Sequence, residues 1–454
     1  ITRPLIEKDD DFSFRHALKD LLKAAGPTIL SYFFQISIQI INLVFLGHID
    51  KYRMDGIGLG NMWANITGLG VGWGLAGALD TLCSQAFGSG DKKMVSVWTN
   101  RGLIVMTISM LPISISWLYT KEVLVMIGVH VQIAQYSYNY LVRVLPGLWF
   151  FLAFDVIRRF LQAQGFFWPC LWVNIITCLT HIVLCYIFVV YLNLYELGAG
   201  YATCITYIAT FIIGMKLVYQ LKLDTSWLSL DMTNFSRQIV YYLKFALPSA
   251  ASYILDQINY DVTQYEANLL GVDEQTAHIG VSNTSSMIFS IVIGISVSTS
   301  VFVGKFLGEG NNRKAKVYGK AGVCLICAII LPILGLIILF RDDVCRQYTY
   351  DLPVRYLMAR VLILTCIFCL IDAIQFVIYG ILKGLAKQKE ASIAIFCSYY
   401  ILALPLGYYL AFSTSWRLYG IWIGMIIGAV MTLLLMTGLL IKARWVAVTV
   451  KSED

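Results

Sequence analysis

Residues 87–93 read FGSGDKK, and residues 307–314 read LGEGNNRK. Each stretch follows a long apolar segment and precedes another, RGLIVMTISMLPISI at 101–115 and AGVCLICAIILPILG at 321–335. The two copies are separated by a constant offset, because the following positions correspond: Gly88 with Gly308, Gly90 with Gly310, Gly102 with Gly322, and Pro112 with Pro332. The chain therefore consists of two similar halves, which together form an internal repeat.

The composition predicts a membrane protein. Of the 454 residues, 58% are apolar and only 13% are charged, and the mean hydropathy is +0.72. A spanning helix needs about 20 apolar residues, so a dozen spans would use most of the chain and leave no room for a large soluble domain. We expect an all-α membrane protein with twelve transmembrane helices, at about residues 26–48, 57–87, 99–118, 133–162, 168–192, 198–221, 240–270, 276–307, 318–340, 353–384, 391–412 and 417–441.

Each half has six spans, and because six is an even number the second half starts on the same side of the membrane as the first. Both halves therefore cross the membrane in the same direction. The repeat is then parallel, with a pseudo-two-fold axis along the membrane normal, an arrangement that transporters use and that channels and enzymes do not need. We expect two six-helix lobes, residues 12–221 and 238–445. A lead-in at 1–11, an inter-lobe loop at 222–237 and a tail at 446–454 complete the expected organisation.

The basic residues predict the orientation. Of the 34 Lys and Arg residues, 25 fall on the side that holds both termini. Cytoplasmic loops carry the excess of positive charge, so both termini, the lead-in, the inter-lobe loop and the tail should lie in the cytosol. We expect a multi-pass monomer in the lipid bilayer of the plasma membrane or of a vacuolar or vesicular membrane, and no nucleic-acid partner.

Two predicted spans of the second half carry acids near their centres, where a charge costs at least about 2.5 kcal/mol and marks a functional site by default. Helical spacing places Asp256 on one face with its neighbours at i+3 and i+4, and Asp261 opens a second polar face. The tenth span carries Asp372. The candidate proton- and substrate-binding residues are Asp256, Asp261, Asp372, Gln257, Asn259, Tyr260, Gln264, Gln375 and Tyr379. The alternative is that these polar groups only hold helices together.

The first half offers weaker candidates, Asn42, Asp80, Gln85 and Asp155. Asp155 is followed at i+3 and i+4 by Arg158 and Arg159, so a structural ion pair is at least as probable an interpretation as a transport role. Asp80 precedes the loop after the second span and is expected to cap or tie that loop. His181 is a lone imidazole within the fifth span, which is more often a satisfied interior residue than a proton relay.

Enzyme, cofactor and metal chemistry find little support in the sequence. The chain lacks a G-x-x-x-x-G-K-[ST] phosphate-binding loop, so transport should draw on an ion gradient or run downhill. Ten of the 11 cysteines fall inside apolar runs, and only Cys345 is expected in a loop. The CxxC pairs 324/327 and 366/369 lack further ligands nearby. We expect no cofactor, no metal and no enzymatic activity.

Seven motifs in order resemble the multidrug and toxic compound extrusion (MATE) family, in particular its eukaryotic branch. They are NLVFLGHI (42–49), LDTLCSQAFGSGD (79–91), FLQAQG (160–165), LPSAASYILDQINYD (247–261), VFVGKFLGEGN (301–311), YGILKGLAKQK (379–389) and YYILALPLG (399–407). The resemblance covers about residues 15–445. It implies acids in the seventh helix at the positions of Asp256 and Asp261 and one in the tenth at Asp372, although these relatives mostly carry Glu there.

The resemblance implies a secondary antiporter that exports organic cations or other xenobiotics in exchange for H⁺ by alternating access. Two alternatives remain open at this stage: Na⁺-coupled antiport by the same fold, and a lipid-linked oligosaccharide flippase of the wider superfamily, which would need cavity cations. Bacterial relatives often carry an acid at the position of Asn42. Because a neutral amide cannot store a proton, coupling is expected to rest on the second half.

Overall fold

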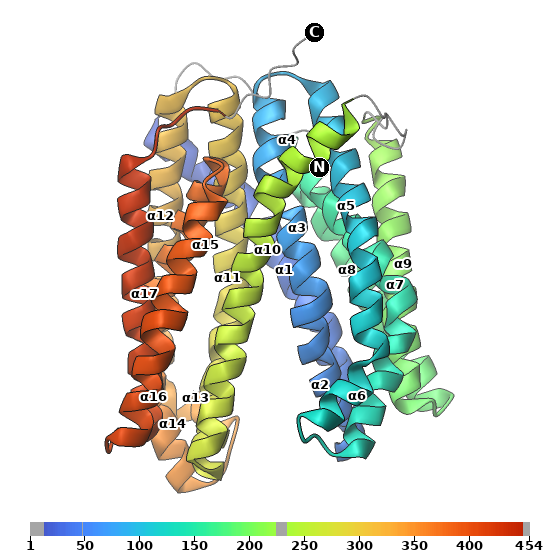
Figure 1. Ribbon diagram of the computed structural model, residues 1–454, viewed down its shortest axis with the longest axis vertical. Coiled ribbons are helices and arrows are strands. Elements are labelled where there is room, and N and C mark those ends of the chain that lie inside the picture. The colour runs from blue at the N-terminus through green and yellow to red at the C-terminus, as the bar shows by residue number, and fades with distance from the viewer. Residues whose placement is uncertain (1–12, 48, 224–233, 448–454) are drawn as a thin grey trace. The chain divides into compact units, whose positions relative to one another are not determined.

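The computed structural model describes residues 13–47, 49–223 and 234–447, and throughout these ranges every regular element is a helix (Figure 1). In the first half these are α1 (Phe14–Gly47), α2 (Lys51–Ala64), η1 (Asn65–Leu69), α3 (Gly70–Ala76), α4 (Leu79–Gly88), α5 (Lys92–Leu118), α6 (Thr120–Met126), α7 (Val131–Ala163), α8 (Phe167–Cys185), η2 (Tyr186–Tyr191) and α9 (Tyr195–Gln220). The elements η1 and η2 are π-helical turns.

The second half repeats the pattern. Its elements are α10 (Phe235–Leu270), α11 (Val272–Gly308), α12 (Asn312–Leu339), α13 (Arg341–Arg346), α14 (Leu352–Gly384), α15 (Gln388–Phe396), the π-helical η4 (Cys397–Ala403), α16 (Leu404–Ser413) and α17 (Arg417–Lys442). The predicted lead-in, residues 1–11, and most of the predicted inter-lobe loop and tail lie outside the described residues.

Eleven helical segments of the described chain are long and apolar enough to cross a membrane. The twelfth span is α10, which has the length but whose interior acids and amides lower its hydropathy. Twelve spans were predicted, and apart from the start of α1 their ends lie within seven residues of the observed helices. That helix begins at Phe14, not near residue 26, because a polar first segment with Arg15, Lys19 and Lys23 continues it.

The repeated turn that revealed the two halves has the same geometry in both. Gly90 and Gly310 have φ angles of +82° and +73°, a region that favours glycine. The next residue caps the following helix, since Asp91 accepts a hydrogen bond from the Met94 amide at 2.9 Å and Asn311 accepts one from Lys314 at 3.0 Å. The sequence repeat is thus a structural repeat.

The chain divides into two compact units. Within the described ranges the first unit contains residues 30–254, and the second contains 13–29 and 255–447. The boundaries fall inside α1 and α10, so the first segment of each helix belongs to the unit built mainly from the other half. In the second unit the Tyr318 hydroxyl donates to Asp20 at 2.8 Å, and in the first the Tyr242 hydroxyl donates to the Leu75 carbonyl at 2.9 Å.

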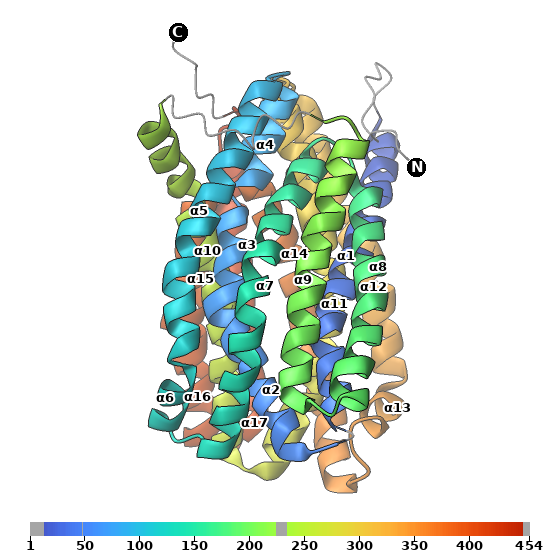
Figure 2. The same cartoon turned by 90° about the vertical axis from the view of Figure 1, so that its right-hand side faces the viewer.

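Small residues allow close helix packing within each unit. In the first unit α7, α8 and α9 run side by side (Figure 2), and a Cβ at Gly147 of α7 would lie 2.8 Å from the Cys204 backbone of α9. In the second unit α11 and α14 pack along each other, where Ser296 donates to the Phe376 carbonyl at 2.7 Å. Close approach without bulky side chains is the usual way in which membrane helices associate.

One expectation about the loops is wrong. Cys345 does not lie in a loop but in the short helix α13, where its side chain is fully buried. The reason is that α13 packs against α14 and supplies an apolar contact from outside the spanning segments. This burial raises the pKa of the Cys345 thiol to about 11.

Candidate functional site

The candidate site is a small cavity inside the second unit. Its lining residues come from α10, α11, α14 and η4 and comprise Asp256, Asn259, Tyr260, Phe289, Phe368, Asp372, Phe376 and Tyr399. A water-sized guest can occupy about 10 Å³ of it, which is the space of a single water molecule. In this state the cavity therefore fits a proton, a water molecule or a small cation, and it is too small for a bulky organic molecule.

Two acids from different helices face this cavity. Asp256 comes from the middle of α10 and Asp372 from the middle of α14, and both line the same space. The walls beside them are aromatic: Tyr260 meets Phe368 edge to face at 6.4 Å between ring centroids, and Phe289 meets Phe376 at 5.0 Å. None of the eight lining residues is a Lys, Arg or His. The two carboxyl groups thus share a site that contains no basic lining group.

Polar oxygens complete the lining. The Asn259 amide nitrogen lies 3.5 Å from the Met425 sulfur, and its Oδ1 is buried without a hydrogen-bond partner among the described residues. The Tyr399 hydroxyl donates to Gln375 Oε1 at 3.5 Å. Gln375 does not itself line the cavity, but it accepts the hydrogen bond of Tyr399, which does, and so orients that side chain.

Four other sequence candidates do not line the cavity. Asp261 interacts with Gln257, one turn before it on α10, and Gln264 lies half-buried further along the helix. Five residues correspond to about 500° of helical rotation, which turns Asp261 some 140° away from Asp256. Tyr379 lies beyond the cavity, with its ring 5.9 Å from Phe376 and 5.8 Å from the Lys383 amine.

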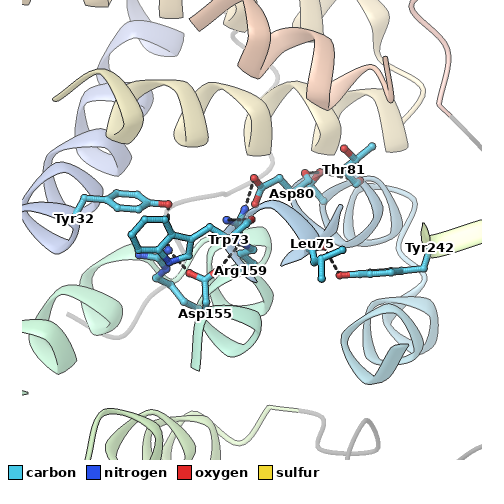
Figure 3. A network of polar contacts seen from close by, with 10 residues as sticks. Tyr32, Trp73, Leu75, Asp80, Thr81, Asp155, Arg159 and Tyr242 are labelled. Atoms are coloured by element: carbon cyan, nitrogen blue, oxygen red, sulfur yellow. Dashed lines mark hydrogen bonds and ion pairs between the residues drawn. The ribbon is translucent and has the colours of Figure 1, made fainter. Parts of the chain in front are cut away.

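The candidate acids of the first half form a separate buried cluster (Figure 3). Arg159 lies between Asp80, at 2.5 Å, and Asp155, at 3.0 Å, and it also donates to the Trp73 carbonyl at 3.2 Å. Asp155 also pairs with Arg158. Each of these four charged side chains is only 1% exposed. Asp80, which the sequence analysis placed as a possible cap or tie for the loop after the second span, pairs through its carboxylate with Arg159 on α7.

Two candidates of the first half remain. Asn42 is fully buried and donates to Thr203 at 2.9 Å and to Tyr140 at 3.3 Å. Gln85 is buried in α4. Neither side chain ionises. Of the four candidates in the first half, only Asp80 and Asp155 are acids, and both are paired with arginines.

The sequence interpretation missed four cavity residues, Phe289, Phe368, Phe376 and Tyr399. Aromatic residues make up 14% of the chain, so nothing in the pattern distinguishes these four from residues that face lipid. Tyr399 had one signal, since it belongs to the YYILALPLG motif, but the motif does not say which way its ring points.

Comparison with known proteins identifies the family. The MatE family model matches residues 27–187 and 248–409, one match in each half. Protein DETOXIFICATION 16 of Arabidopsis thaliana is 29% identical over 420 residues, covering 91% of this chain and 86% of that protein. The human multidrug and toxin extrusion protein 1 is 27% identical, covering 95% and 76% respectively.

The fold also has solved counterparts. The crystal structure of the eukaryotic MATE transporter AtDTX14 superposes with a TM-score of 0.87 at 23% identity, covering 95% of this chain and 97% of that one. Because the family model matches both halves and the fold is the two-lobe, twelve-helix fold of these transporters, the chain belongs to the multidrug and toxic compound extrusion family and is a membrane transporter, not an enzyme.

Proposed function

We propose that this protein is an antiporter that exports organic cations or other xenobiotics in exchange for H⁺, with Asp256 and Asp372 holding the coupling proton. The names of the human and Arabidopsis relatives, multidrug and toxin extrusion and detoxification, support this class of substrate. The observation that carries the proposal is that both aspartates line one cavity without a basic lining residue.

Electrostatics favours an exchangeable cation at this pair. Two ionised carboxylates in this small, aromatic-lined cavity would repel each other and lose hydration, so the pair is stable only when a proton or another cation is present. The cavity holds a proton or a small cation but no organic cation, so we propose that the organic cation binds at the pair only in another state of the transport cycle, after the proton has left. Proton and substrate therefore compete for the pair, and this competition is the coupling.

Alternating access converts the competition into transport. We propose that the lobes predicted from the repeat, residues 12–221 and 238–445, present the site to opposite sides of the membrane in turn. A ligand shifts such an equilibrium only by its differential affinity for the two states. The proton and the organic cation must then favour opposite-facing states.

The remaining polar residues of the second half are assigned by their distance from the cavity. Asn259 and Tyr260 line it, and Gln375 orients Tyr399. We assign Gln257, Asp261, Gln264 and Tyr379 to the route by which the proton or the substrate approaches the pair. In the first half, position 42 carries the neutral residue Asn42 and not an acid, so we assign the coupling proton to the second half.

Coupling to Na⁺ is the second candidate, and one observation favours it. The buried Asn259 Oδ1 has no hydrogen-bond partner among the described residues, and two tyrosines, Tyr260 and Tyr399, also line the cavity. Hard cations need several oxygen ligands in fixed geometry. A flippase for an anionic lipid-linked sugar finds less support, because such a cargo needs cationic lining residues.

Transport by the purified protein in lipid vesicles tests the proposal. An imposed pH gradient without Na⁺ should drive a fluorescent organic cation across the membrane in the wild type, and Asp256→Asn or Asp372→Asn should reduce the rate at least about tenfold, a change of about 1.4 kcal/mol. Glu266→Gln is the matched control, since it also neutralises a buried acid of α10 but lies outside the cavity. Transport that requires Na⁺, or normal rates in both aspartate variants, would reject the assignment.

We also propose that both termini face the cytosol and that the protein acts as a monomer in a plasma or vacuolar-type membrane. Ser89 and His130 are exposed and belong to consecutive connections, which must face opposite sides. An impermeant thiol reagent should label His130→Cys in intact cells and Ser89→Cys only after permeabilisation, relative to the parent protein. The reverse pattern would invert the orientation.

A further inference from the structure

A buried imidazole of the second unit has no part in the aspartate cavity. His278 of α11 is only 2% exposed, and its Nδ1 has no hydrogen-bond partner among the described residues. The Trp422 ring of α17 lies beside it, at 5.6 Å between ring centroids, and the Trp422 Nε1 is likewise buried without a partner in the described ranges. Buried polar groups that lack a protein partner are normally satisfied by ordered water. Internal water is therefore expected beside His278.

One helical turn before His278, α11 carries a carboxylate at the surface. Glu274 accepts a hydrogen bond from Arg417 Nε at 2.6 Å, and the Arg417 side chain is 56% exposed. Because α11 begins directly after α10 has crossed the membrane, this ion pair lies at the end of the second unit that the proposed orientation places outside. Residues four positions apart share a helix face. A surface acid thus stands on the same face as the buried imidazole.

The polar face continues from His278 towards the cavity. Ser282 follows at i+4, and its Oγ is buried without a hydrogen-bond partner among the residues that the structure describes. Ser285 comes three positions later, and its Oγ lies 3.2 Å from the Cys369 sulfur on α14. Asp372 is again three positions further along α14 and lines the cavity. Polar side chains therefore follow one another in steps of one helical turn from the surface to this acid.

We propose that this series of side chains is a proton path from the outer surface to Asp372, joined by internal water. Its members in order are Glu274, His278, Ser282, Ser285 and Cys369. Side chains one turn apart are about 5–6 Å apart at Cβ, a gap that one water molecule bridges. The imidazole accepts a proton at one ring nitrogen and releases one from the other, and the proton ends on the Asp372 carboxylate. The inference rests on the proposed H⁺ antiport and adds the route from outside.

The composition of the path selects protons. Between Glu274 and Asp372 it offers one imidazole, two hydroxyls and a thiol, and these do not supply the several oxygen ligands in fixed geometry that a hard cation needs. It passes through the buried part of α11, so an organic cation cannot follow it. The path therefore lets a proton reach the aspartate pair in the state described here, in which the cavity is too small for an organic cation.

Two modes of transport separate the path from the rest of the cycle. The full chain in lipid vesicles is given radiolabelled tetraethylammonium without Na⁺, either under a pH gradient or at equal pH with the unlabelled ion on the other side. Exchange of one cation for another needs no proton. His278→Gln should slow transport driven by the pH gradient at least about tenfold and leave exchange at the wild-type rate. Damage to the fold would slow both modes.

A second variant and two matched controls support the comparison. Ser282→Val should show the same separation of the two modes, because valine removes the hydroxyl and fills the space of a bridging water. His181→Gln changes the fully buried imidazole of α8 in the first unit, and Ser286→Val makes the same substitution at an exposed position of α11. Both controls should keep both rates.

The outcomes distinguish the path from the antiport on which it rests. Normal transport under the pH gradient in His278→Gln, or an equal loss of both modes in His278→Gln and Ser282→Val, overturns the path. If Asp372→Asn loses transport driven by the pH gradient while His278→Gln keeps it, the antiport stands and only the path is rejected. A wild type that exchanges cations but does not respond to the pH gradient rejects H⁺ coupling and the path with it.

Discussion

Arg159 on α7 and Asp80 on α4 form an ion pair with an N–O distance of 2.5 Å inside the first unit, although 79 positions separate them in the chain (Figure 3). Arg159 also pairs with Asp155 and donates a hydrogen bond to the carbonyl of Trp73, in the middle of α3. The second span is divided into α2, η1, α3 and α4. The guanidinium of Arg159 therefore links α3 and α4 of this span to α7. A buried cation in this position should be important for stability.

Arg159→Gln should lower the free energy of unfolding by about 3–5 kcal/mol, because it removes the cation that two buried carboxylates face. The exposed pair Lys387–Glu390, at 2.8 Å, serves as the comparison, and Glu390→Gln should cost less than about 1 kcal/mol. Thermal unfolding in detergent measures both. Equal, small effects would mean that the buried cluster contributes little to stability.

Two adjacent tyrosines of α10 give a matched pair. Tyr242→Phe removes a hydrogen bond to the Leu75 carbonyl and should cost about 1–2 kcal/mol. Tyr241→Phe should be neutral or slightly stabilising, since the Tyr241 hydroxyl is buried without a hydrogen-bond partner among the described residues. The two melting temperatures should therefore separate, and a larger loss in Tyr241→Phe would contradict the account.

The ends of α7 and α14 offer a comparison between the halves. Gly165 and Ala386 follow these helices with φ angles of +88° and +60°, so alanine occupies a conformation that glycine adopts more easily. Ala386→Gly should leave stability unchanged or raise it by up to about 1 kcal/mol, and Gly165→Ala should lower it by about 1–2 kcal/mol. Unfolding measurements that gave the opposite signs would refute the shared geometry.

Cys345 should resist alkylation. The thiolate is the reactive form, and with a pKa raised to about 11 by burial the thiol stays protonated near pH 8. Mass spectrometry after maleimide treatment should find Cys345 unmodified in the folded protein at pH 8 and modified after denaturation. Rapid labelling of the folded protein would show that α13 opens.

Much of the architecture was predictable because lipid imposes a simple rule on spanning helices. Apolar length located the spans, and the spacing of Gly90 and Gly310 revealed the repeat. The site was predictable only in part. Asp256 and Asp372 were recognised as interior acids, but their meeting in one cavity depends on how α10 and α14 pack, which the sequence does not encode locally.

Helical periodicity contained two further signals. The five-residue step from Asp256 to Asp261 separates their side chains by about 140° around the helix, which agrees with the second polar face that the sequence assigns to Asp261. His181 and Cys185 are four positions apart and share a face, although the imidazole was interpreted as a lone group. The aromatic lining carried no such signal, because Phe289 and Phe376 resemble lipid-facing residues.

Proton release on substrate binding tests the central proposal most directly. Purified protein in weakly buffered solution at constant pH is mixed with a fluorescent organic cation, and a pH indicator reports released protons. The wild type should release about one proton for each cation bound without Na⁺, and Asp372→Asn should release none while Glu266→Gln behaves as wild type. Cation binding without proton release, or unchanged release from Asp372→Asn, would contradict the assignment of the coupling proton to the Asp256–Asp372 pair.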